Sequence, residues 1–174
     1  MSESYWNISC LTPGEKSTLR RCAGKMMGND MRAMKAFYHA LEYRRVSNEE
    51  EKIYFAALCM ECLWDTKDCP KTELFEIMLH DMYHDKKATD STRHKLTAFF
   101  DTPWGEDGFL LGKLCSLVRR MHANNVAKMP DFEKLADDLR HWNYSDKYIQ
   151  RRWIKTICVE SQIAEKMEEE KNVD

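Results

Sequence analysis

The clearest structural pattern in this chain is the stretch LLGKLCSLVRRM at residues 110–121. Its apolar residues fall at positions i, i+1, i+4, i+7, i+8 and i+11, which is the spacing of one face of an α-helix. Asn124 and Pro130 follow and are typical of a helix end and the connection after it. We therefore expect a long helix here, with its leucines in the core and Lys113, Arg119 and Arg120 outside it.

Helical signals continue on both sides of this stretch. Thr12-Pro-Gly-Glu15 and Ser47-Asn-Glu-Glu50 are capping boxes, which begin helices that we expect to run to about Met27 and Trp64. Further helices are predicted from Asp30, from Pro70–Thr72, over 93–100, from Phe132, and over about 145–168. Only six Gly and four Pro interrupt the 174 residues, too few for the frequent turns of a sheet protein.

The predicted fold is therefore all-α, a single-domain helical bundle of about seven to nine helices. We expect this domain to span residues 1–168, with halves at 1–90 and 91–168. The segment 169–174 is predicted to be a frayed acidic tail.

Composition favours a reduced, cytoplasmic protein outside the membrane. The longest apolar run, Ile53–Met60, has eight residues, whereas crossing a bilayer takes about 20. The chain starts without a secretory signal, and its seven cysteines lack the spacing of a disulfide framework. Cys59 and Cys62 form a CxxC inside an apolar helical run, which indicates buried thiols. We expect no metal and no cofactor.

Charge is distributed in blocks, although the net charge is only −2. Residues 1–45 carry +4 and residues 110–155 carry +5, while residues 46–109 carry −7 and residues 156–174 carry −4. A nearly neutral chain can therefore present a strongly basic surface if the first and third blocks meet in the fold.

Within these two blocks, Lys and Arg gather on the outer faces of predicted helices. A groove lined by such residues binds phosphates and gains affinity by releasing counterions, and a tyrosine such as Tyr148 can stack a base. The alternative is that each cation lies on a solvated face or pairs with a local acid. The three clusters are Arg20, Arg21 and Lys25; Lys113, Arg119 and Arg120; and Arg151, Arg152 and Lys155.

Several short motifs resemble one known family. LADDLRHW at 135–142 and IQRRW at 149–153 resemble the C-terminal signature of the small subunit of type I-E CRISPR Cascade, the CasB family. LTPGEKSTLRR at 11–21, Phe37-Tyr38 and RHKLTAFF at 93–100 resemble earlier family segments in the same order.

This resemblance implies an all-helical, non-catalytic protein that works inside the surveillance complex. Its expected partners are the guide RNA, the target and displaced DNA strands, the other Cascade subunits, and a second copy of itself placed head to tail. Its basic surface is expected to stabilise the R-loop. Matching motifs carry over Arg20, Arg21, Arg93, Lys95, Arg151 and Arg152. Lys113 falls near a basic pair of the family in which Gly112 replaces one member.

Two other functions fit parts of the sequence. His80-Asp81 with His84 one turn later slightly resembles the metal-dependent HD phosphohydrolases, for which His39 and Asp137 would have to supply the remaining ligands. No Gly-rich phosphate loop or nucleophile motif supports catalysis. A helical scaffold without a nucleic-acid role is the third interpretation.

Overall fold

The computed structural model describes residues 3–64, 71–124 and 127–159, and within them the chain forms eight α-helices. This confirms the all-α prediction. A 3-10 turn, η1 (Ile8–Cys10), precedes the first helix, and a π-helical turn, η3 (Lys155–Val159), follows the last. The α-helices are α1 (Pro13–Arg21), α2 (Met31–Ala40), α3 (Asn48–Glu61), α4 (Phe75–Tyr83), α5 (Asp90–Thr97), α6 (Phe109–Asn124), α7 (Phe132–Arg140) and α8 (Tyr148–Ile154).

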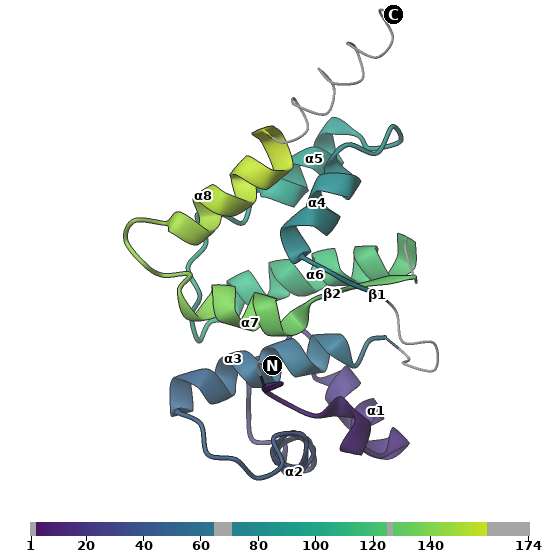
Figure 1. Cartoon of the computed structure of the whole chain (residues 1–174), viewed down its shortest axis with the longest axis vertical. Helices are drawn as coiled ribbons and strands as arrows, with labels where there is room; N and C mark the ends of the chain where they lie inside the picture. Colours follow the sequence, from purple (N-terminus) through teal and green to yellow (C-terminus); the bar gives the residue numbers. More distant parts are fainter. Residues whose placement is uncertain (1–2, 65–70, 125–126, 160–174) are drawn as a thin grey trace, which may run out of the picture.

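The helices are arranged in tiers along the long axis of the molecule (Figure 1). α1 and α2 form one end, α3 lies beside α7 and α6 in the middle, and α4, α5 and α8 form the other end. Because α3 is enclosed by this arrangement, all eight residues from Ile53 to Met60 are buried, which explains why the run is apolar on every face of the helix.

Both predicted capping boxes are present. The Glu15 amide donates to Thr12 Oγ1 at 3.1 Å, and the Glu50 amide donates to Ser47 Oγ at 3.3 Å. The acidic side chain of each box accepts from the backbone amide of its capping residue, so two otherwise unpaired donors are satisfied at each helix start.

Several predicted helix bounds are wrong. The helix predicted over 93–100 is α5, which spans Asp90–Thr97. α1 ends at Arg21 rather than near Met27, because the chain turns at Gly24, whose φ is +83°. No helix begins at Pro70–Thr72. Instead β1 (Lys71–Glu73) pairs in parallel with β2 (Lys128–Pro130), and α4 starts at Phe75. That strand depends on a partner far along the chain, which local patterns do not reveal.

The predicted thiols and the C-terminal helix are placed as follows. Cys59 and Cys62 are buried, and burial raises the pKa of Cys62 to about 12. The last helix starts at Tyr148 rather than near Ser145, while residues 160–168 and the predicted tail 169–174 lie outside the described residues. None of the described helices is long and apolar enough to cross a membrane. The division into halves stays a prediction, although β1 and α4 pack with β2 and η3 across it.

Candidate nucleic-acid interface

The loop after α1 packs directly on α6. Gly24 approaches Cys115 so closely that a Cβ on Gly24 would lie 3.1 Å from the Cys115 sulfur. At the start of α6, a Cβ on Gly108 would lie 3.3 Å from Cγ of Met26. Both glycines have positive φ, so the contact needs their backbone freedom as well as their small size. These contacts bring together the first and third basic blocks of the sequence.

The loop that carries Lys25 of the first predicted cluster therefore lies against the helix that carries the second. Lys25 follows Gly24 directly, and Arg119 lies one helical turn after Cys115 and hydrogen-bonds to it. Burial raises the pKa of the Cys115 thiol, although the charge and hydrogen bond of Arg119 oppose the rise. We call the joined surface the cationic face; its residues are Arg20, Arg21, Lys25, Lys113, Arg119 and Arg120.

The cationic face is exposed, and within the described residues its cations have no acidic partner in an ion pair. Arg20 Nε donates to the Cys62 carbonyl at 2.8 Å, and Lys113 Nζ donates to Thr102 Oγ1 at 3.1 Å, so both partners are uncharged. Among the described residues, no carboxylate forms an ion pair with any of its six cations. Five of the six are exposed, and Arg120 is half-buried.

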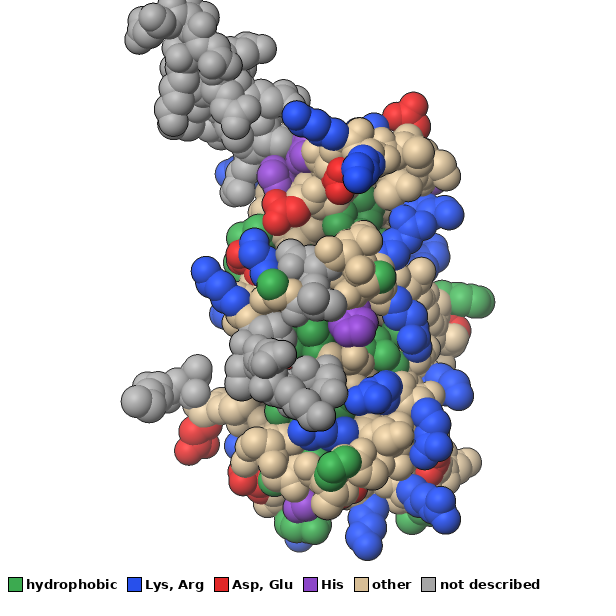
Figure 2. All heavy atoms as spheres, turned by 90° about the vertical axis from the view of Figure 1, so that its right-hand side faces the viewer, with side chains coloured by type: hydrophobic (Ala, Val, Ile, Leu, Met, Phe, Trp, Pro, Cys, Tyr) green, Lys and Arg blue, Asp and Glu red, His purple; other side chains and the backbone are tan. Residues whose placement is uncertain are grey.

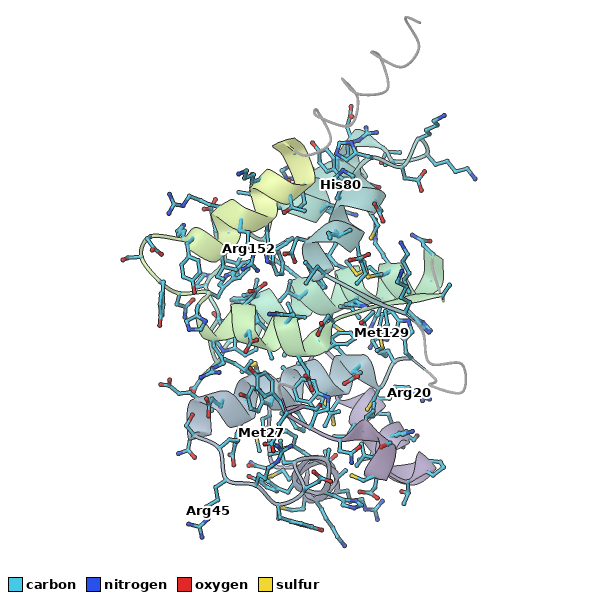
Figure 3. All side chains as sticks on the ribbon, in the orientation of Figure 1. Arg20, Met27, Arg45, His80, Met129 and Arg152 are labelled. Carbon is cyan, nitrogen blue, oxygen red and sulfur yellow. The ribbon has the colours of Figure 1, made fainter. Side chains whose placement is uncertain are left out.

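Figure 2 shows the side of the molecule on which α1 lies. Lys and Arg side chains gather there in a band that runs along much of the molecule, with few Asp or Glu among them. Arg20 lies on this side (Figure 3). The arrangement suits a ligand that carries regularly spaced negative charge.

The residues predicted on α5 differ from each other. Lys95 is exposed and forms no ion pair within the described part of the chain. Arg93 is held locally, because its Nε donates to the Tyr83 carbonyl at 3.0 Å and its Nη1 lies 3.3 Å from Asp90 Oδ1. Its guanidinium also lies 6.0 Å from the centre of the Tyr83 ring.

The α8 cluster is separate from the cationic face. α8 lies at the opposite corner of the molecule from α1 (Figure 1). Arg151 and Lys155 are exposed and form no ion pair in the described ranges. Arg152 lies between two buried acids: its Nη2 is 2.5 Å from Asp138 Oδ2 and its Nε is 3.6 Å from Glu76 Oε1. The predicted stripe on this helix is therefore partly neutralised.

The pKa of Arg152 reflects this setting. Burial opposes its charge, but the hydrogen bond to Asp138 and the charges of Asp138 and Glu76 outweigh burial and raise the pKa. Because Trp153 Nε1 also donates to Asp138 Oδ2, at 2.8 Å, the acid joins α7 to α8. Arg152 therefore stabilises the packing of α8 against α7 (Figure 3).

The residues proposed for an HD phosphohydrolase do not converge. His39 Nδ1 lies 2.8 Å from Glu15 Oε2 on α1, and His80 Nδ1 lies 3.2 Å from its neighbour Asp81 on α4. Asp137 accepts a hydrogen bond from the Tyr5 hydroxyl at 2.6 Å. α2 and α4 belong to opposite ends of the molecule, so this ligand set is wrong. In the described ranges, no three His, Cys, Asp or Glu side chains are placed to hold a metal ion.

Comparison with known proteins agrees with this geometry. A family model described as CRISPR-associated protein Cse2 matches residues 15–156. The chain belongs to the Cse2 family. This confirms the resemblance to the Cascade small subunit. No curated protein matches the chain in sequence.

Solved structures share the Cse2 fold of this chain at low sequence identity. CasB from M. ruber is 15% identical, with a TM-score of 0.69 and 90% of each chain covered. CasB from Thermus thermophilus is 21% identical, with a TM-score of 0.60, covering 82% of this chain and 84% of that one. A chain of a CRISPR RNA-guided surveillance complex is 21% identical, with a TM-score of 0.64 and 88% of each chain covered.

One further basic surface lies outside the three predicted clusters. Arg32 and Lys35 are exposed on α2 and line a groove against α1, together with Tyr43 beyond the end of α2. Their spacing of three residues on a helix with a well-defined apolar face was the signal available for finding them.

Proposed function

We propose that this chain is the non-catalytic small subunit of a type I-E Cascade surveillance complex and that its cationic face binds nucleic-acid backbone. The observation that carries the proposal is the contact of the loop after α1 with α6, beside which exposed cations of both segments lie without an ion-paired carboxylate among the described residues. Membership of the Cse2 family and the shared fold support it.

The physical basis is electrostatic. Each phosphate that a Lys or Arg neutralises releases condensed counterions and adds about 0.7 to 0.9 to the salt slope of binding. Such contacts do not identify bases, so binding is independent of sequence. R-loop formation exchanges DNA pairing for RNA–DNA pairing at near balance, and a few backbone contacts are enough to stabilise the open state.

The partners follow from this role. The cationic face contacts the target strand, the displaced strand or the guide RNA, and the remaining surface contacts other Cascade subunits and a second copy placed head to tail. The complex acts in the cytoplasm. Within this proposal, three exposed cations outside the cationic face make additional contacts with nucleic-acid backbone: Arg151, Lys155 and Lys95. Arg93 and Arg152 instead stabilise the fold.

The test measures binding of the full chain to a labelled single-stranded oligonucleotide over a series of salt concentrations starting at about 50 mM. The double variant Lys25→Glu with Arg119→Glu is expected to bind about tenfold or more weakly, and to lower the salt slope by about 1.4 if two single-strand phosphates are lost. The matched control is Arg45→Glu with Lys134→Glu, which makes the same charge change at exposed positions on other elements.

Equal losses in both double variants would indicate a net-charge effect and contradict a defined binding face. Unchanged binding and salt-independent assembly with partner proteins would instead support the helical scaffold. Co-purification of the chain with guide RNA and other subunits, followed by R-loop formation with each variant, tests the role inside the complex.

A further inference from the structure

A groove with a volume of about 530 Å³ lies between α1 and α2. It adjoins the cationic face, because Thr18 lines the groove and Arg21 follows three residues later on the same side of α1. Its volume falls in the range of about 300–1,000 Å³ found for small-ligand sites. The lining side chains that matter here are those of Thr18, Glu15, Arg32, Lys35, His39 and Tyr43.

One wall of the groove is aromatic and held in an unusual backbone conformation. Tyr43 is 73% exposed, and its ring stacks on His39 with centroids 6.2 Å apart. Its φ is +60°, in the left-handed region that favours glycine. Glu42 shares this conformation, and the Tyr43 amide donates to the Tyr38 carbonyl at 3.0 Å, so the turn that ends α2 places the ring beside the groove.

The other wall is basic. Arg32 and Lys35 are exposed on α2, and neither pairs with a carboxylate in the described parts of the chain. Glu15 is the acid in the groove, and it is already engaged with His39 at 2.8 Å and with the backbone amide of Thr12. The groove therefore combines an exposed aromatic ring with two cations that can bind an anion.

We infer that this groove binds one nucleotide of the single strand that runs along the cationic face. The base stacks on Tyr43, and Arg32 and Lys35 bind the adjoining phosphate. Stacking uses the ring face that every base has, so the site tolerates any sequence. The inference rests on the proposed function and adds a base contact to a surface that otherwise contacts phosphates.

The test compares ring variants on the same full chain and oligonucleotide. Base–aromatic stacking of the usual strength corresponds to an affinity loss of roughly fivefold or more for Tyr43→Ala. Tyr43→Phe keeps the ring and is expected to bind like the wild type. Tyr43→Gly removes the ring while suiting the positive φ, so it is expected to lose affinity without loss of thermal stability. Tyr144→Ala is the matched control, since Tyr144 is 53% exposed between α7 and α8.

An abasic oligonucleotide of the same length separates stacking from phosphate binding. Wild type and Tyr43→Ala are expected to bind it equally, whereas Arg32→Glu with Lys35→Glu weakens binding to both oligonucleotides. Photo-crosslinking of a 5-iodouracil strand is expected to label Tyr43 or His39.

Two results would overturn the inference: unchanged affinity for base-containing DNA in Tyr43→Ala and Tyr43→Gly, or crosslinks found only elsewhere. If Lys25→Glu with Arg119→Glu still weakens binding in that case, the proposed function stands without this site. If that variant also binds normally, both fail.

Discussion

Replacing Arg152 with alanine is expected to destabilise the fold through the two acids that its guanidinium neutralises. Asp138 is 7% exposed and Glu76 is 4% exposed, so the variant leaves two buried carboxylates without that cation. Removing one partner of a buried ion pair costs about 3–5 kcal/mol. Because the Arg152 side chain is itself 47% exposed, water screens part of this interaction, and we expect about 2–3 kcal/mol.

For a chain of this size, each kcal/mol changes the melting temperature by about 2–4 °C, so Arg152→Ala should melt roughly 4–12 °C lower. Far-UV circular dichroism follows the transition. Arg151→Ala is the matched control. Arg151 is the neighbour of Arg152 and its side chain is exposed, so its removal should change the free energy of unfolding by less than about 0.5 kcal/mol.

Equal melting of Arg152→Ala and Arg151→Ala would refute this reasoning, since the acids would then not depend on the guanidinium. That result would return Arg152 to the set of residues available for phosphate binding.

Two further predictions concern single positions in α3 and in the loop after α1. Burial raises the pKa of Glu61 from 4.5 to about 7, against the lowering effect of its hydrogen bond from Trp6. The unfolded chain therefore ionises first, and the wild type should lose about 2–3 kcal/mol relative to Glu61→Gln as pH rises from 4.5 to 7, measured by urea unfolding; parallel pH profiles would contradict this. Gly24→Ala should cost about 2 kcal/mol or more, because it combines positive φ with a Cβ 3.1 Å from the Cys115 sulfur. Calorimetry measures this loss, and a melting temperature equal to that of the wild type would disprove the close-contact argument.

Local sequence patterns predicted the helices whose formation depends only on residues close to one another in the chain. The capping boxes at Thr12 and Ser47 use side chains within four residues of each other, so their outcome does not depend on the rest of the fold. The apolar stripe at 110–121 likewise needs only helical geometry. β1 was missed because its stability comes from pairing with β2, and Lys71 has no local feature that indicates Lys128 as its partner.

The candidate site, like the fold, could be predicted from the sequence only in part. The types and helical faces of the cations could be predicted from spacing, because a side chain opposite an apolar stripe has to face outward. Their pairing could not. Arg151 and Arg152 are adjacent and chemically identical in the sequence, yet the acid that distinguishes them, Asp138, comes from another helix.

The amino-acid sequence alone predicted that this chain forms helices with basic outer faces and that it resembles the Cascade small-subunit family. Tertiary packing decided which basic segments lie together, through the contact of Gly24 with Cys115 that places the loop after α1 against α6. The physical reason is the distance along the chain over which each property is determined. Helix formation depends on residues a few positions apart. The electrostatic potential of a surface depends on charges that are distant in sequence and that the packed core brings close together in space.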